Sequence, residues 1–242
     1  MTSLGRHAAA IAALPGDIAS LTAWLQERFI HEAWADQYGV DVGEDPDTVH
    51  VRGVEDLLDL AGDGAKVPTM CRGYSVLLAA MLRLHGVPAQ ARCGFATYFQ
   101  PGWYESHWTV RYGDGRWADP QLDDLQRDFL GITFDPLDLP AGAFLTGRQA
   151  WRLVREGGAD AEAFGHSAEQ KGEWFVAGDV LKDRVAEQGV AALPWDAWDP
   201  MPGPGDEIDL ALFDDYAAGR RPVSVPARVS NKRRGRFEDL CG

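Results

Sequence analysis

The stretch Met70-Cys71-Arg72-Gly73-Tyr74 places one thiol directly before an apolar run. Residues 73–85 are apolar on nearly every side, which predicts a buried helix rather than a surface helix. Gly86 and Pro88 predict the end of that helix. We therefore expect Cys71 in or just before the first turn. There, unpaired amide N–H groups and the positive end of the helix dipole favour a thiolate over a thiol.

Three candidate strands follow this helix. Residues 89–99 alternate loosely between apolar and polar, and the pattern stops at Pro101-Gly102. Residues 106–112 form the second strand, the Gly-Asp-Gly sequence at 113–115 a tight turn, and residues 116–119 the third strand. The pattern predicts an antiparallel sheet next to the buried helix.

His107 and Asp119 lie on the two strands of the predicted hairpin, so one turn can make them neighbours. A thiol, an imidazole and a carboxylate in this order are typical of a nucleophile, its base and the group that orients the base. Most free cysteines are small buried hydrophobic residues, and Cys93, in mid-strand, fits that description better than Cys71. Cys241 stands beside the last residue, where we expect disorder.

These residues together resemble the transglutaminase-like core, a branch of the papain-like cysteine enzymes. The resemblance covers about residues 67–122. It rests on Cys71 before an apolar helix, Gly86-Val87-Pro88-Ala89, His107-Trp108-Thr109-Val110, the Gly-Asp-Gly turn, Arg116-Trp117 and Asp119-Pro120. It implies an α+β fold in which the helix with the nucleophilic cysteine packs on an antiparallel sheet bearing His and Asp. It also implies that Cys71 is the nucleophile, His107 its base and Asp119 the orienting acid.

The reaction implied is acyl transfer through a thioester acyl-enzyme at Cys71, from an amide- or thioester-bearing small molecule, peptide or carrier. An amine acceptor gives a transglutaminase or amide synthase, and water gives an amidase. Two alternatives stay open: a cysteine peptidase or amidase that uses water only, and a non-catalytic binding or regulatory module. The Cys71 N–H is one expected oxyanion donor, and Trp34, Tyr98 or a backbone group is the second.

Composition narrows the class of protein. The chain has 242 residues, 45% of them hydrophobic, which is enough for a sizeable core. A net charge of −14 argues against a nucleic-acid partner.

The sequence contains no run of eighteen apolar residues and no secretory signal. Its three cysteines suit a reducing compartment. We therefore expect a cytoplasmic protein without membrane contact. Neither a phosphate loop nor zinc spacing is present, and we expect no cofactor and no metal.

The flanking sequence predicts mainly helices around one domain, residues 1–219. On the N-terminal side, Asp17 can cap an amphipathic helix, and residues 54–60 form a short one. Beyond the core we expect a helical connection from 121 to 129 and three additional helices, at residues 144–155, 174–188 and 207–218. Residues 220–242 are basic and contain prolines, which is typical of a flexible, solvated tail.

Overall fold

The protein is described here by a computed structural model that covers residues 2–62 and 64–240. It is a mixed α+β protein whose described chain forms two compact units. The N-terminal unit contains residues up to 91 and 109–139, and the C-terminal unit contains residues 92–108 and 140–240. The chain passes between the two units more than once. The expected single domain of residues 1–219 stays a prediction.

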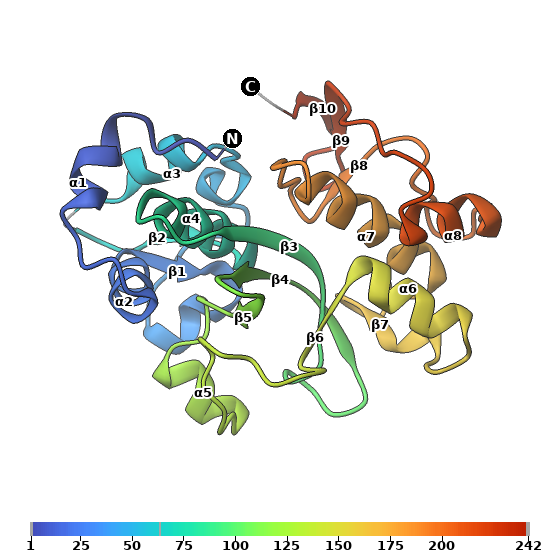
Figure 1. Cartoon of the computed structure of the whole chain (residues 1–242), viewed down its shortest axis with the longest axis horizontal. Coiled ribbons are helices and arrows are strands. Elements are labelled where there is room, and N and C mark those ends of the chain that lie inside the picture. The colour runs from blue at the N-terminus through green and yellow to red at the C-terminus, as the bar shows by residue number, and fades with distance from the viewer. Residues whose placement is uncertain (1, 63, 241–242) are drawn as a thin grey trace. The chain divides into compact units, whose positions relative to one another are not determined.

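Helix α4 (Cys71–Leu84) is the centre of the N-terminal unit. Helices α1 (Ala8–Ala12), α2 (Ile18–Arg28) and α3 (Val54–Leu60) all pack against it, as Figure 1 shows in blue and cyan. Every residue of α4 from Cys71 to Leu82 is buried. The prediction of a buried helix is therefore confirmed, and the helix begins two residues earlier than expected.

The predicted helix after Asp17 is also confirmed. The Asp17 carboxylate accepts a 2.9 Å hydrogen bond from the Ser20 N–H and so caps α2. The chain then turns into β1 (Phe29–His31), which pairs in parallel with β2 (Val67–Thr69). Short 3₁₀ segments complete this unit's N-terminal half: η1 (Gly5–His7), η2 (Glu32–Tyr38) and η3 (Asp47–His50).

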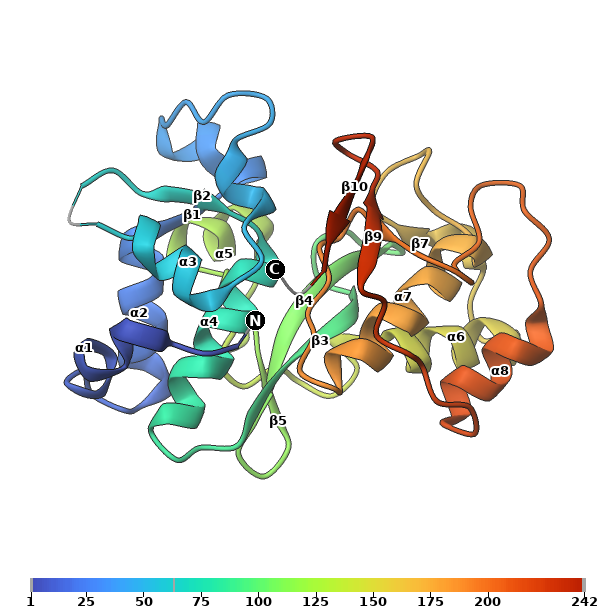
Figure 2. The ribbon, with the colours of Figure 1, turned by 90° about the horizontal axis from the view of Figure 1, so that it is seen from above.

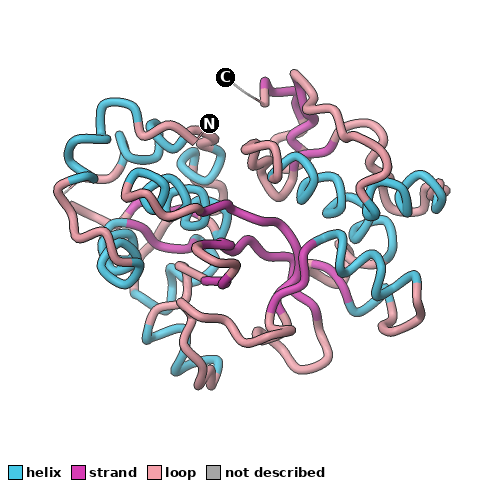
Figure 3. Tube along the Cα trace, viewed as in Figure 1, coloured by secondary structure: helices cyan, strands magenta, loops and turns pink. Residues whose placement is uncertain are grey.

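The main sheet has the antiparallel hairpin that the sequence predicts (Figure 3). Its strand order is β5 (Arg116–Ala118), β4 (Tyr104–Tyr112), β3 (Ala89–Ala96) and β6 (Phe144–Thr146), and β7 (Phe164–Gly165) pairs with β4 in parallel. The Gly115 N–H donates to the Tyr112 carbonyl across the tight turn. Helix α5 (Asp124–Leu130) follows the hairpin.

Residues 144–146 correct the expectation of one helix over 144–155. They form β6, which pairs with Gly94–Ala96 of β3. Gly94 permits this close approach, because a Cβ there would collide with the Leu145 carbonyl. Helix α6 (Gly147–Arg155) starts only after Thr146, whose side chain forms a capping box with Gln149.

Three helices build the C-terminal unit. Helix α6 packs against both α7 (Glu173–Ala186) and α8 (Leu210–Ala218), and a short η4 (Ala161–Ala163) precedes β7. Helix α8 starts later than expected because the Asp209 carboxylate caps it at the Leu212 N–H. The buried core of this unit includes Phe95, Trp151, Phe164, Val180 and Phe213.

The basic C-terminal segment is the largest departure from expectation. Residues of the expected flexible tail, 220–242, form the hairpin β9 (Arg228–Asn231) and β10 (Arg236–Asp239), drawn in red in Figure 2. Strand β9 also pairs with β8 (Asp196–Ala197), and Val229 and Leu240 are buried. A local hairpin and one distant strand therefore order this segment. Cys241 lies outside the described residues.

None of the helices in the described chain combines the length and the apolar character needed to cross a bilayer.

Candidate active site

Cys71 is the first residue of α4, a helix of 14 residues, and is only 5% exposed. Met70 at the N-cap is extended and makes no side-chain hydrogen bond to the helix. The first-turn amides next to the Cys71 sulfur are therefore not capped by that side chain. Such a helix start stabilises a negative charge, either on sulfur or on an oxyanion beside it.

Contacts on both sides hold the start of α4 in place. Arg72 is buried and donates hydrogen bonds to the carbonyls of Val51 and Arg52, at 3.2 and 2.8 Å. Gly73 packs so closely on Thr69 of β2 that an added Cβ would collide with the Thr69 hydroxyl. The backbone that presents the thiol is therefore fixed by tertiary contacts as well as by the helix.

Two buried hydroxyls of the N-terminal unit were not singled out from the sequence. Ser75 lies four residues after Cys71, on the same face of α4. Thr109 lies on β4. Within the described residues neither hydroxyl has a hydrogen-bond partner, and a buried unpaired hydroxyl costs free energy. A polar group one helical turn from the thiol is a feature that a substrate or a water could satisfy.

Asp119 follows β5 directly and is fully buried. Its N–H donates to the Pro136 carbonyl at 2.7 Å, and its Oδ1 accepts a 3.1 Å bond from the Gln121 N–H. Gln26 of α2 donates to the carbonyls of Pro120 and Leu122. The backbone on both sides of the carboxylate is thus anchored to other elements of the unit.

The carboxylate of Asp119 also affects the pKa of Tyr74. Burial raises the pKa of Tyr74 well above its usual value of 10, and the negative charges of Asp123 and Asp119 raise it further. Tyr74 therefore remains a neutral phenol at physiological pH. It can contribute an apolar ring or a hydrogen bond to the surroundings of α4, but no charge.

His107 lies on β4 and is 3% exposed. Its ring meets the rings of Phe99 and Tyr98 nearly edge to face, with centroids 4.9 and 6.3 Å apart. These aromatic contacts restrict the orientation of the imidazole. They also place Tyr98, one of the candidate oxyanion donors, beside the candidate base.

A buried polar network holds the strand next to His107. The Ser106 hydroxyl donates to Asp179 Oδ2 at 2.9 Å, and Lys182 Nζ donates to Asp179 Oδ1 at 3.0 Å and to the Pro194 carbonyl at 2.7 Å. Asp179 and Lys182 lie on α7, which Figure 1 shows in orange. Sequence inspection missed this network because charged residues within a helical pattern are usually solvent-exposed.

The predicted site residues belong to different units. Cys71 and Asp119 are in the N-terminal unit, and His107 is in the C-terminal unit, just before the point in β4 where the units divide. The meeting of the three side chains therefore stays a prediction. Trp34 packs its ring on Phe129 at a centroid distance of 5.3 Å, and its role as an oxyanion donor also stays a prediction.

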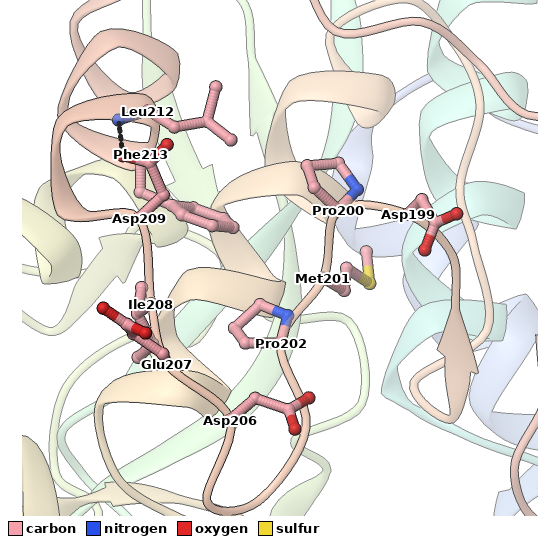
Figure 4. Close-up of a pocket in the computed structure, with 10 residues that line it drawn as sticks. All are labelled: Asp199, Pro200, Met201, Pro202, Asp206, Glu207, Ile208, Asp209, Leu212 and Phe213. Atoms are coloured by element: carbon pink, nitrogen blue, oxygen red, sulfur yellow. Dashed lines mark hydrogen bonds between the residues drawn. The ribbon is translucent and has the colours of Figure 1, made fainter.

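A concave feature lies in the C-terminal unit, away from the predicted site residues in sequence (Figure 4). It is a hollow of about 320 Å³ beside the start of α8. The carboxylates of Asp206 and Asp209 at its edge already accept hydrogen bonds from the backbone N–H groups of Gly203 and Leu212. Its lining contains carboxylates but no cysteine, serine, histidine or lysine, and no described group of His, Cys, Asp and Glu could hold a metal ion. The predicted nucleophile, Cys71, belongs to the N-terminal unit.

Comparison with protein-family models, curated proteins and solved structures returns no significant match. The resemblance to the transglutaminase-like core thus rests on the residues of this chain alone.

Proposed function

We propose that the protein is a cysteine-dependent acyl-transfer enzyme with a transglutaminase-like core. The observation that supports this most strongly is the position of Cys71, a buried thiol at the start of a 14-residue helix that the Met70 side chain does not cap. Asp119, a buried and anchored carboxylate, lies in the same unit. Helix-start thiols near a histidine are the ones that ionise and attack carbonyl carbon.

In the proposed first step His107 accepts the proton of Cys71, and the sulfur attacks the carbonyl carbon of an amide or thioester. The tetrahedral oxyanion receives the Cys71 N–H and a second donor, for which Tyr98 and Trp34 are candidates. The imidazolium then protonates the departing amine or thiol, which leaves a thioester on Cys71. Asp119 holds the tautomer of His107 that presents a bare nitrogen to sulfur.

In the second step an amine or water attacks the thioester. His107 takes the proton of the attacking group and returns a proton to the Cys71 sulfur as it leaves. Attack by an amine gives a new amide, and attack by water gives an acid. The first step is the same in both cases, so the acceptor alone separates an amide synthase from an amidase.

A trapping experiment tests the proposal. The protein is incubated with a panel of glutaminyl peptides and acyl thioesters, with and without hydroxylamine, and its peptides are analysed by mass spectrometry. We expect an acyl adduct on the peptide that contains Cys71 and a hydroxamate in the presence of hydroxylamine. Cys71→Ala should abolish both products, while Cys93→Ala, which removes the other described buried thiol, should retain them. An adduct that persists in Cys71→Ala contradicts the proposal.

Burial of the three side chains also favours a second candidate, a binding module without chemistry. Cys71, His107 and Asp119 are all nearly inaccessible, and a catalytic thiol must meet its substrate. In that case no acyl adduct forms on any peptide, and Cys71 and Cys93 react equally with an alkylating reagent. If the carboxylic acid forms in the presence of hydroxylamine but the hydroxamate does not, water is the acceptor. That result supports the hydrolytic form of the enzyme, a peptidase or amidase.

A further inference from the structure

The negative charge of the chain is concentrated in two segments. Residues 32–47 contain six carboxylates and neither lysine nor arginine, and residues 123–138 contain five aspartates and one arginine. Their combined formal charge is −10, against −14 for the whole chain. The two segments are separated by 75 residues in sequence, so the sequence alone does not show that they belong together.

The fold brings part of each segment together in the N-terminal unit. The Tyr38 hydroxyl at the end of η2 donates to Asp123 Oδ2 at 2.5 Å, and the Gln126 side-chain amide of α5 donates to the Tyr38 oxygen at 3.3 Å. Burial and the hydrogen bond to Asp123 raise the pKa of Tyr38, so the phenol keeps its proton. Segment η2 and helix α5 are therefore joined by a specific polar contact.

An aromatic pair, half-buried Trp34 and exposed Phe129, lies at this junction. The Phe129 side chain is 66% exposed and meets the Trp34 ring edge to face. Leu125, four residues before Phe129 on α5, is also exposed. We call Trp34, Leu125 and Phe129 the aromatic surface. Large apolar side chains exposed next to one another are typical of places where a partner binds.

Exposed carboxylates lie on the same two elements, η2 and α5, as the aromatic surface. Asp36 on η2 and Asp128 on α5 are exposed, and in the described part of the chain neither forms an ion pair. Asp124 pairs with Arg127 at 3.2 Å, yet its side chain is 96% exposed. The surroundings also show how a cation can be held here, because Lys66 Nζ lies 5.3 Å from the centre of the Tyr38 ring.

We propose that the aromatic surface is a docking site for a basic polypeptide segment that carries an aromatic or long aliphatic anchor. The anchor covers Phe129 and Trp34, and the lysines or arginines around it face the carboxylates of η2 and α5. Charge complementarity favours this partner over nucleic acid or an anionic lipid surface, which these carboxylates repel.

The two elements that carry the aromatic surface are connected to the segments that carry Cys71 and Asp119. Segment η2 packs on β2, and β2 leads directly into Met70 and Cys71. Helix α5 begins a few residues after Asp119. A segment bound there is held in the unit that carries the candidate nucleophile. The docking itself requires no chemistry at Cys71 and does not rest on the proposed function.

The proposal is tested by fluorescence anisotropy with a labelled peptide of lysines and arginines around one tryptophan, titrated with the full-length protein. We expect Phe129→Ala to weaken binding at least tenfold. Asp36→Asn combined with Asp128→Asn should weaken it and flatten its dependence on salt. The matched control is Phe237→Ala, because Phe237 is also 66% exposed but lies on β10 of the C-terminal unit, where the Arg228 guanidinium carbon is 5.8 Å from the centre of its ring. This variant should bind as the unaltered protein does.

A second peptide, with alanine in place of the tryptophan, separates anchored docking from general attraction. Equal affinity for both peptides would overturn the proposal, and so would an unchanged affinity of Phe129→Ala. Cys71→Ala should bind the tryptophan peptide normally, so a failure of the proposed acyl transfer does not affect this result.

Discussion

Ser106 donates a 2.9 Å hydrogen bond to the buried Asp179, and this bond ties the residue before His107 to helix α7. Lys182 occupies the other oxygen of the same carboxylate, so the negative charge is compensated without solvent. A buried charge pair of this kind is expensive unless its geometry is fixed. The arrangement therefore fixes the strand position from which the imidazole projects.

Removing the Ser106 hydroxyl should disturb the imidazole more than the fold. We expect Ser106→Ala to lower the free energy of unfolding by about 1.5–3 kcal/mol, the usual contribution of a hydrogen bond to a charged group. The rate of Cys71 alkylation near neutral pH should fall several-fold and its pH profile should shift, because His107 is less well placed. Ser106→Thr keeps the hydroxyl and should restore the profile. A loss of stability with an unchanged profile would assign Ser106 a structural role only.

The variant Asp119→Asn should keep the fold but lose the group that orients the His107 ring. Asparagine keeps an oxygen that can accept the Gln121 N–H, so the turn after β5 should survive and the melting temperature should change little. It cannot hold the imidazole as a carboxylate does, and kcat for the best substrate should drop by about 10²–10⁴-fold. Steady-state kinetics with the substrate found by trapping provides the measurement. Full activity of Asp119→Asn would show that another group orients His107.

Gly73→Ala should destabilise the start of α4. The new methyl group collides with the Thr69 hydroxyl, and overpacking of this kind costs about 1–3 kcal/mol. Thr69→Ala removes the colliding oxygen, so the double variant should be more stable than the sum of the two single changes predicts. Chemical denaturation of the four proteins measures this coupling. Strictly additive losses would mean that the helix start relaxes away from β2.

Asp183 should make stability depend on pH. It accepts a 2.7 Å hydrogen bond from Arg92, but burial raises its pKa from 3.8 to about 6. The folded protein therefore holds this proton more tightly than the unfolded chain. The stabilisation is complete below about pH 3.8 and is lost as the pH rises through about 6, by up to ~3 kcal/mol.

Comparison with Asp183→Asn isolates that contribution, because asparagine does not titrate. The unfolding free energy of the unaltered protein minus that of Asp183→Asn should fall between pH 4 and pH 7. A difference that grows with pH would mean that Arg92 and Arg148 outweigh burial and keep the carboxylate ionised.

Local signals in the sequence were sufficient for the elements around the candidate nucleophile. The apolar run before Gly86, the Asp17 cap and the Gly-Asp-Gly turn each act within a few residues, and the structure contains all three elements. The position of Cys71 at the helix start followed from these signals. Such features can be predicted because neighbouring residues determine them.

Pairings between distant segments were not predictable. Strand β6 forms where Gly94 lets residues 144–146 approach, and β9 pairs with the distant β8 as well as with its neighbour β10. The bond from Ser106 to Asp179 likewise joins residues 73 positions apart. A single sequence carries no periodicity that reports such contacts.

Activation of the Cys71 thiol by His107 should appear in the rate at which iodoacetamide alkylates Cys71. Cys93 is the internal reference, because it is also buried and is read from its own peptide in the same digest. We predict that at pH 6.5 Cys71 reacts at least tenfold faster than Cys93, and that His107→Ala removes the difference. Equal rates for the two thiols in the unaltered protein would contradict the account.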